Sequence, residues 1–315
     1  MRNSISENDV RYAFQLLLGR EAESEKVVRE HLSLGTLEAL RTAIMGSQEY
    51  QGKLLQSQFS SKSKWVAVDV LDCFTQWIDL HDRYVSNGCL NNNWEPSETS
   101  YFISKLRAGD VVLDIGANIG WFSLVAAKHI GKNGTVHAFE PRPETAKMLK
   151  RTMADNALRD QVHVWEFALS DAWGTLELVW GKGTDNPGGS FVASTLVNLE
   201  QYETAKVTAG ILDDILPDVA PDVIKIDVEG AEPKVMKGAQ NTLKRKHPPI
   251  LSELFPEQLQ SVSGVSAAQY IGQMKSYGYS CYLLEKGVPT KKLGDFPASS
   301  TRELESVVFE WTGQR

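Results

Sequence analysis

From residue 111 to the end of the sequence, short apolar runs alternate with amphipathic stretches of helical length. This alternation is typical of βαβ units, in which helices connect the strands of a parallel sheet. We expect strands at residues 111–115, 135–139, 162–167, 223–227, 250–254, 280–284 and 305–311, and helices at 121–130, 143–156, 231–243 and 267–277. The last strand has no helix before it, which predicts an antiparallel pair at the end of the sheet. Residues 170–217 form an insertion with one expected strand at 175–180.

The first fifty residues have the spacing of helices instead. Val10, Phe14 and Leu18 recur on one helical face. Further helices are expected at 25–34 and 37–45, and a polar linker at 56–64. With 315 residues the chain has room for two unequal domains. We therefore expect a small helical accessory domain at residues 1–60 and a larger domain at 61–315, made of a lead-in segment at 61–108 and a catalytic core at 109–315.

Composition excludes several classes of protein. The sequence has 40 acidic and 33 basic residues and a formal charge of −7, which disfavours a nucleic-acid backbone as a partner. Cys73, Cys89 and Cys281 are too far apart for a disulfide framework or a zinc site, so we expect a reducing, cytoplasmic compartment. No apolar run is long enough to span a membrane. The oligomeric state stays open.

The segment VVLDIGANIGWFSL, residues 111–124, predicts a ligand-binding turn. Gly116 and Gly120 lie where a buried strand turns into a helix, and glycine lets a ligand pack against bare main chain there. Asn118 takes the place of the second glycine of the dinucleotide fingerprint, and there is no phosphate-binding GxxxxGK[ST] motif. The turn therefore favours a nucleoside cofactor that lacks a pyrophosphate.

Acidic side chains stand at the ends of the first two strands of this series. Asp114 would repel a pyrophosphate but attract the ammonium group of an amino-acid-bearing cofactor. Glu140 follows the second strand, where a carboxylate can accept hydrogen bonds from both hydroxyls of a ribose. Together these residues predict S-adenosylmethionine, with S-adenosylhomocysteine as its product. NAD is the alternative, because NAD-dependent oxidoreductases share the βαβ start and the second acidic residue.

A further acidic segment, IKIDVEGAE at residues 224–232, lies at the end of the fourth strand. Because ligands bind beyond the carboxyl ends of parallel strands, Asp227 and Glu229 are expected to face the reactive end of the cofactor. Either carboxylate can take a proton from a substrate hydroxyl or attract a sulfonium. The alternative for Glu229 is a charge that complements a helix dipole. Glu253, near the end of the fifth strand, is the third catalytic candidate, since a buried carboxylate needs partners.

Other residues have structural interpretations. Glu232 is interpreted as a helix charge, Lys225 as a structural side chain, and His137 and His163 as packed within strands. A divalent metal held by the three catalytic candidates is an alternative way to acidify a hydroxyl, but we expect no metal. Candidates for stacking on a sugar ring, each with ordinary packing as the alternative, are Trp94, Trp180 and Phe191.

Eight motifs occur in one order: NNNWEPSET (91–99), GDVVLDIGANIGWFSL (109–124), VHAFEPRPE (136–144), FALSD (167–171), GGSFVAST (188–195), LDDIL (212–216), IKIDVEGAE (224–232) and ILSEL (250–254). This series resembles the FkbM family of S-adenosylmethionine-dependent methyltransferases. The resemblance implies a class I methyltransferase fold, an α/β, Rossmann-like seven-stranded sheet in the order 3-2-1-4-5-7-6 with the last strand antiparallel. It also implies O-methylation.

The resemblance also implies a role for each matching residue. The cofactor-binding set is Asp114, Gly116, Ala117, Asn118 and Gly120 at the turn, Glu140 and Pro141 beside the ribose, and Ala168 and Asp171 near the adenine. Glu95 and Glu98 of the WEPSET segment are expected to close over the methionine end or over the acceptor, with a capped helix start at Ser97 as the alternative. Asp227, Glu229 and Glu253 stay the catalytic candidates.

Residues 16–50 resemble a small helical domain of unknown function found beside bacterial carbohydrate enzymes. This likeness implies a bacterial protein that acts on a polysaccharide or glycosylated product, with the accessory domain binding the acceptor or another protein. We therefore expect a sugar hydroxyl as acceptor. A polyketide or other natural-product hydroxyl is the alternative, and a non-catalytic docking protein is a further one. The cofactor motifs identify neither the acceptor nor the position methylated.

Overall fold

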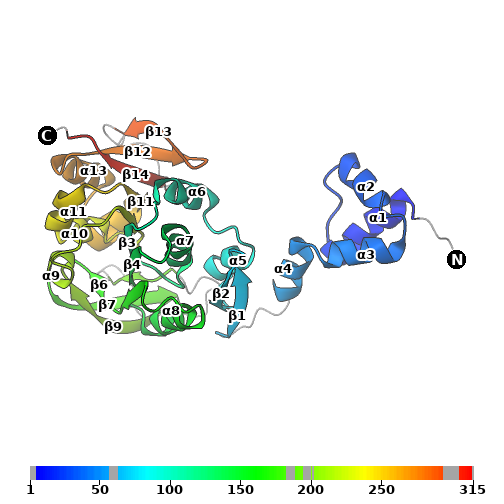
Figure 1. Ribbon diagram of the computed structural model, residues 1–315, viewed down its shortest axis with the longest axis horizontal. Coiled ribbons are helices and arrows are strands. Elements are labelled where there is room, and N and C mark those ends of the chain that lie inside the picture. The colour runs from blue at the N-terminus through cyan, green and yellow to red at the C-terminus, as the bar shows by residue number, and fades with distance from the viewer. Residues whose placement is uncertain are drawn as a thin grey trace. The chain divides into compact units, whose positions relative to one another are not determined.

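The computed structural model describes residues 5–56, 63–181, 189–193, 200, 202–293 and 305–313 (Figure 1). The chain divides into two compact units, Met1–Lys64 and Trp65–Arg315. Most of the expected linker, and the glycine-rich part of the insertion at 182–188, lie outside the described residues. In the described ranges no helix is both long enough and apolar enough to cross a lipid bilayer.

The smaller unit is helical and has its own apolar core. Its elements are α1 (Glu7–Ala13), a π-helical turn (Phe14–Leu18), α2 (Glu25–Leu32), α3 (Leu37–Met45) and α4 (Gln48–Gln56). The core consists of Val10, Phe14, Leu18, Val28, Leu40 and Ile44. The spacing of the first three residues therefore marks a buried face, as expected. The Thr36 hydroxyl caps α3 by accepting a hydrogen bond from the Ala39 amide.

The larger unit is built on an eight-stranded sheet in the order β13-β12-β14-β11-β10-β3-β4-β5. Its strands are β3 (Val111–Ile115), β4 (Thr135–Phe139), β5 (Val162–Trp165), β10 (Val223–Ile226), β11 (Ile250–Leu254), β12 (Tyr279–Glu285), β13 (Val288–Leu293) and β14 (Glu305–Trp311). The five neighbouring strands β5, β4, β3, β10 and β11 pair in parallel. Strand β14 is antiparallel to both β11 and β12. Apart from β13, this is the order 3-2-1-4-5-7-6.

Two strand predictions need correction. The expected terminal pair lacked β13, which follows β12 through a tight turn at Lys286 and Gly287 and pairs with β12 as an edge strand. Both turn residues have positive φ, at 51° and 77°, which suits the twist of a two-residue hairpin. The third strand ends at Trp165 instead of residue 167, because the chain then enters a different sheet.

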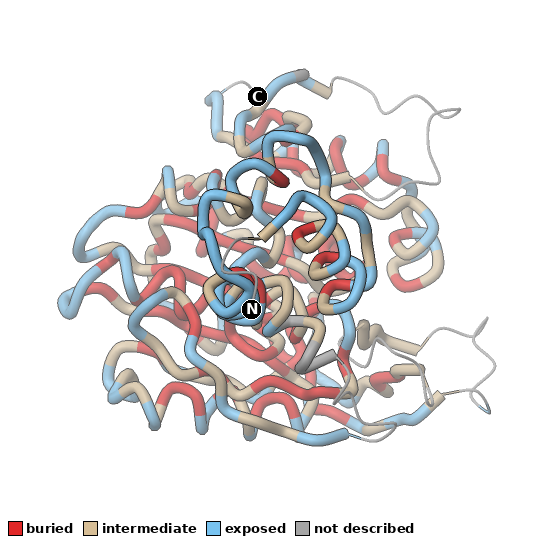
Figure 2. Tube along the Cα trace, turned by 90° about the vertical axis from the view of Figure 1, so that its right-hand side faces the viewer, coloured by how far each residue is buried: buried red, intermediate tan, exposed pale blue. Residues whose placement is uncertain are grey.

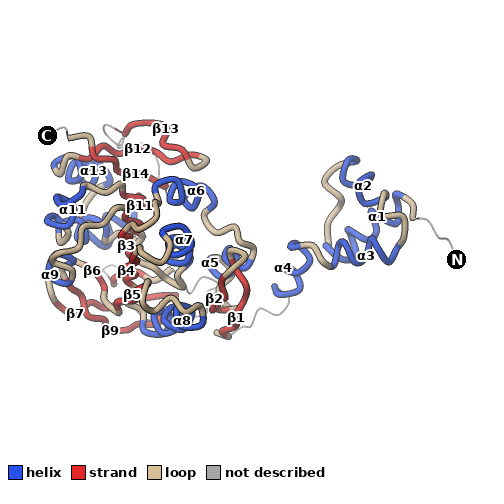
Figure 3. Tube along the Cα trace, in the orientation of Figure 1, coloured by secondary structure: helices blue, strands red, loops and turns tan. Residues whose placement is uncertain are grey.

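Helices cover both faces of the main sheet (Figures 1 and 3). On one side lie α10 (Glu232–Lys237), α11 (Gln240–Lys246) and α13 (Ala267–Ser276), and on the other α6 (Pro96–Lys105), α7 (Trp121–Ile130) and α8 (Pro143–Asp155). The single helix expected at 231–243 is divided at Gly238. A Cβ at this glycine would lie 2.2 Å from the Ser170 carbonyl oxygen, so the close approach of two segments requires the glycine.

The insertion contributes a second, smaller sheet. It has the order β6-β9-β7-β8, with β6 (Ala168–Leu169), β7 (Gly174–Gly181), β8 (Phe191–Val192) and β9 (Tyr202–Gly210). The one strand expected here corresponds to β7. The lead-in segment forms an antiparallel hairpin of β1 (Trp65–Val70) and β2 (Phe74–Asp79), followed by α5 (Val85–Leu90). The remaining short elements are α9 (Leu212–Ile215), α12 (Pro256–Gln258) and a π-helical turn (Leu259–Ser263).

Buried residues concentrate along the central strands and on the helix faces that cover them (Figure 2). Leu113, Ile224, Ile250 and Phe309, from four neighbouring strands, have no exposed surface. This apolar core holds the parallel strands in register, so the carboxyl ends of β3, β4, β10 and β11 meet at one edge of the sheet.

Candidate active site

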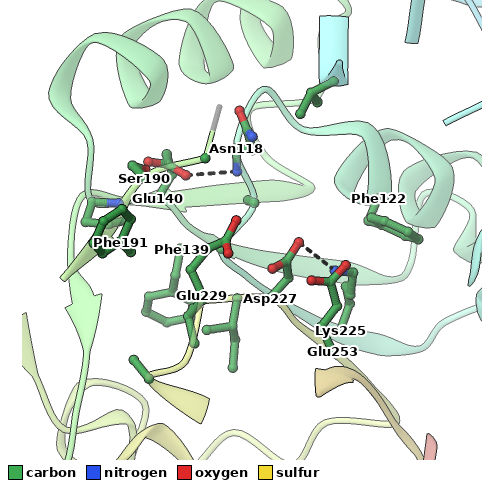
Figure 4. Close-up of a pocket in the computed structure, with 18 of the residues that line it drawn as sticks. Asn118, Phe122, Phe139, Glu140, Ser190, Phe191, Lys225, Asp227, Glu229 and Glu253 are labelled. Carbon is green, nitrogen blue, oxygen red and sulfur yellow. Dashed lines mark hydrogen bonds and ion pairs between the residues drawn. The ribbon is translucent and has the colours of Figure 1, made fainter. Parts of the chain in front are cut away.

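A cavity of about 620 Å³ opens at this edge of the sheet (Figure 4). Among the residues that line it are eleven of the predicted site residues: Glu98, Gly116, Ala117, Asn118, Gly120, Glu140, Pro141, Ala168, Asp227, Glu229 and Glu253. Sequence positions more than a hundred residues apart therefore meet in one hollow. Two other predicted residues, Asp114 and Asp171, do not line it.

The turn after β3 brings bare main chain against the end of β10. Gly116 has φ 83°, and a Cβ there would lie 1.8 Å from the carbonyl oxygen of Asp227. Gly120 has φ 93°, and a Cβ would lie 2.3 Å from Cδ1 of Leu149. Asn118, between them, also has a left-handed backbone, with φ 50°. The two glycines are therefore needed for packing as well as for opening the turn to a ligand.

Glu140 lies at the end of β4 beside this turn. Its two carboxylate oxygens accept hydrogen bonds from the amides of Asn118 at 2.9 Å and Arg142 at 2.8 Å. Burial raises the pKa of Glu140 to about 7, and these two hydrogen bonds oppose the shift. Each oxygen keeps a second lone pair, so the carboxylate, once oriented, can still accept hydroxyl groups of a ligand.

Apolar groups surround this end of the cavity. Phe139, Phe167, Leu169, Leu178 and Phe191 all belong to its lining. Figure 4 shows Phe191 and Ser190 next to Glu140, on the side away from the other carboxylates. A flat aromatic base fits such walls. Of the proposed sugar-stacking residues, Trp94 lines the cavity, whereas Trp180 does not and instead lies under the Arg142 guanidinium, 4.3 Å from its ring centre.

The predicted role of Asp114 must be revised. Its side chain is buried and accepts a hydrogen bond from the Ser123 hydroxyl at 2.6 Å, so it faces α7 behind the turn. Burial raises the pKa of Asp114 to about 6. Asp171 points elsewhere and pairs with Lys237 at 2.8 Å. Neither carboxylate is placed to touch a ligand in the cavity. Asp114 instead supports the turn after β3, which lines the cavity.

The opposite end of the cavity holds a buried lysine, Lys225, for which the sequence predicts a structural role. Lys225, on β10, is 3% exposed and lines the cavity. Its ammonium lies 3.2 Å from Asp227 Oδ2 and 4.0 Å from Glu95 Oε2, and 5.0 Å from the centre of the Phe122 ring. Burial alone would lower the pKa of Lys225, but Asp227, Glu95 and Glu253 reverse this and raise it. The lysine therefore stays charged.

Three further carboxylates surround this pair. Burial, reinforced by the charge of Asp227, raises the pKa of both Glu229 and Glu253. Burial also raises the pKa of Glu95, against the opposing effect of Lys225, and Glu95 Oε2 is a buried atom without a hydrogen-bond partner. The Gln258 amide donates a hydrogen bond to Glu229. Glu95 and Glu229 both have positive φ, at 42° and 54°, a backbone strain often stored at functional sites.

The structure extends the role predicted for Glu232 and agrees with the packed position predicted for His137. Glu232 is more than a helix charge, because its buried carboxylate accepts the amides of Val228 and Gly230 and so shapes the turn that carries Glu229. His137 is packed, as expected. Burial lowers the pKa of His137 to about 4, and the Trp165 indole donates a hydrogen bond to its Nδ1 at 3.3 Å.

One set of carboxylates has the spacing of a metal site. Oxygens of Glu95, Asp227 and Glu253 lie within 4.8 Å of one another, so the set differs from the predicted one by having Glu95 in place of Glu229. The Lys225 ammonium pairs with two of these three residues. The Lys225 ammonium therefore already balances part of the negative charge of this set.

The fold and the site together define an α/β protein with a cavity at the carboxyl edge of a parallel sheet, where proteins of this architecture bind their ligands. A model of the methyltransferase FkbM domain matches residues 114–281, more than half of the sequence. The chain belongs to this family.

Curated relatives share this part of the chain. The 31-O-demethyl-FK506 methyltransferase FkbM of Streptomyces tacrolimicus is 31% identical over 167 residues, which cover 44% of this chain and 62% of that one. The hexuronic acid methyltransferase AglP of Haloferax volcanii is 29% identical over 148 residues, covering 45% and 55%. The chain thus spans less than two thirds of the length of either relative. A solved FkbM methyltransferase from Methylobacillus flagellatus is 17% identical, with a TM-score of 0.43, and the match covers 95% of this chain and 58% of that one.

Proposed function

We propose that the protein is an S-adenosylmethionine-dependent O-methyltransferase that acts on a sugar hydroxyl. The observation that carries this proposal is the division of one cavity into two ends. One end has apolar walls and a carboxylate suited to a ribose, and the other has an ion pair set among carboxylates. Membership of the FkbM family and the names of its relatives support methyl transfer.

The residues at the turn fit this cofactor. Gly116 leaves main chain bare, Glu140 has lone pairs for two ribose hydroxyls, and the aromatic walls suit an adenine. When bound, the cofactor supplies a methyl group on a positively charged sulfur. Asp227 and Glu229, two carboxylates that line the same cavity, would stabilise that charge.

The same residues can manage the proton. We propose that Asp227 is the residue that accepts the proton released by the acceptor hydroxyl. The cofactor, when bound, would supply the methyl group to the hydroxyl oxygen, and its sulfur would keep the electron pair of the carbon–sulfur bond. Lys225 holds Asp227 in place through their ion pair. Glu229, aligned by Gln258, is the alternative base. A positioned base contributes about 10²- to 10⁴-fold, and alignment of the two reactants contributes more.

Calorimetry tests the cofactor assignment. S-adenosylhomocysteine should bind the 315-residue chain with measurable heat, whereas NAD should not. Binding of NAD alone would overturn the assignment and favour an oxidoreductase.

Substitution tests the base. With radiolabelled methyl donor and methyl glycosides as acceptors, Asp227→Asn should lose at least about 100-fold in kcat while keeping its affinity for S-adenosylhomocysteine. Asp160→Asn, which removes an exposed carboxylate just before β5 at the opposite edge of the sheet, is the matched control. Full turnover by Asp227→Asn would remove Asp227 from the mechanism, and loss of turnover in Glu229→Gln instead would transfer the role to Glu229.

The smaller unit has an accessory role in this proposal. Its apolar core is formed by residues of its own helices. We propose that it binds the acceptor or another protein, while Trp65–Arg315 carries the chemistry.

A further inference from the structure

The end of the cavity around Lys225, where the proposed function places the acceptor, is called the acceptor end here. Its walls carry many more acidic than basic side chains. The acidic residues that line it are Glu95, Glu98, Asp227, Glu229 and Glu253. In the described part of the lining, Lys225 is the only basic residue. The titratable groups that face the acceptor are therefore almost all carboxyl groups, and burial raises the pKa of three of them, Glu95, Glu229 and Glu253.

Lys225 is not available to an anionic acceptor. Its ammonium pairs with Asp227 at 3.2 Å and lies 4.0 Å from Glu95, and its side chain is 4% exposed. The Phe122 ring lies 5.0 Å from the ammonium. A carboxylate or phosphate on the acceptor would have to compete with Asp227 for this charge and would lie next to like charges.

The same walls are rich in groups that accept hydrogen bonds. Glu95 Oε2 is buried and has no hydrogen-bond partner, and its ion pair with Lys225 is long, at 4.0 Å, so a donor on the acceptor would lower the cost of burying this oxygen. The other wall carboxyls retain lone pairs beyond the hydrogen bonds that Glu229 receives from Gln258 and Glu98 from Ser306. Hydroxyl and amino groups are donors of the required kind.

This inference rests on the proposed methyl transfer and makes its acceptor more specific. We propose that the carbons next to the reacting hydroxyl carry hydroxyl or amino groups and no carboxylate or phosphate, as in a neutral sugar or an amino sugar. Such an acceptor donates hydrogen bonds to the carboxyl wall without adding negative charge to it. An acidic sugar would leave its own charge unpaired in the cavity.

Three matched sugars test the proposal: a methyl glucoside, the corresponding glucosaminide and the corresponding glucuronide. Methyl transfer from radiolabelled S-adenosylmethionine is measured as kcat/KM for each sugar at pH 7.5. The glucoside and the glucosaminide should be methylated. The glucuronide should be about 10- to 100-fold poorer, the effect of one unpaired like charge a few ångströms away in a medium of intermediate dielectric.

A charge-removing variant supplies the second readout, which is the ratio of kcat/KM for the glucuronide to that for the glucoside. Glu95→Gln should raise this ratio about threefold or more, because it removes one carboxylate from the wall. Asp160→Asn should leave the ratio unchanged, since Asp160 is exposed away from the cavity. A general loss of activity cancels in the ratio, and a melting curve checks that each variant is folded.

The outcomes separate this inference from the proposed function. A glucuronide methylated as well as or better than the glucoside overturns the inference and leaves methyl transfer intact. If the protein binds S-adenosylmethionine but methylates none of the three sugars, both the sugar acceptor and this inference are overturned. If it does not bind the cofactor, the proposed function itself fails.

Discussion

Replacement of Gly116 by alanine tests whether the turn after β3 needs a glycine because it lies so close to the end of β10. Gly116 has φ 83°, and the Cβ of an alanine there would lie 1.8 Å from a backbone oxygen that cannot move without shifting β10. Gly109 is an internal control, because it has φ 88° and a Cβ there would meet nothing within 4 Å. The two substitutions therefore share the cost of a left-handed alanine and differ in the clash.

Gly109→Ala should lower the free energy of unfolding by about 1–2 kcal/mol, the cost of the left-handed backbone. Gly116→Ala should lower it by about 2–5 kcal/mol, because overpacking adds roughly 1–3 kcal/mol. Urea denaturation measures both, and calorimetry measures the affinity for S-adenosylhomocysteine, which only Gly116→Ala should weaken. Equal losses of stability in the two variants, with unchanged affinity, would refute the reasoning.

Three further substitutions test individual side chains. Glu140→Gln should weaken S-adenosylhomocysteine binding about 10- to 100-fold in calorimetry, because hydrogen bonds to a charged group contribute about 1.5–3 kcal/mol. Burial raises the pKa of Glu232 from 4.5 to about 7, so the folded state holds its proton more tightly, and stability falls as pH rises from about 4.5 to 7. Glu232→Gln should flatten this fall by up to about 3 kcal/mol in urea denaturation at pH 4.5 and pH 8; an unchanged pH profile would contradict it. Ser123→Ala should destabilise the fold by about 1–3 kcal/mol by leaving buried Asp114 without its hydroxyl partner, yet keep S-adenosylhomocysteine binding within a few-fold. A large loss of binding at normal stability would restore a direct role for Asp114.

The parallel part of the sheet was predictable because burial on both faces leaves mostly apolar runs, such as VVLDI in β3 and VIKI in β10, each interrupted by a single charged residue. β13 was not, since VPTKKL has a proline after its first residue and carries two lysines, which is tolerated only because it is an edge strand. The division of α10 from α11 depends on contact between Gly238 and Ser170. This contact joins residues far apart in the sequence, so the sequence around Gly238 does not predict it.

The site was predictable to the extent that strand ends specify it. Glu140, Asp227 and Glu253 follow or end parallel strands, and the topology alone brings them together. The direction of Asp114 depends on which face of β3 it occupies, and a strand buried on both faces gives no polarity pattern to decide this. Lys225 likewise looked like one polar residue in an apolar strand, because its partner Glu95 lies 130 positions earlier in a helix start whose placement is purely tertiary.

The contact between Gly116 and the carbonyl of Asp227 has a practical consequence for altering acceptor preference. Gly116 belongs to the turn proposed to bind the cofactor, and Asp227 belongs to the end of the cavity proposed to bind the acceptor. Because their main chains are in contact, a backbone shift introduced at one of them is transmitted to the other. Trp94 and Phe255 also line the cavity, and neither is among the atoms that meet at this junction. Engineering of new acceptors should therefore vary those residues first and leave the glycine–aspartate junction untouched.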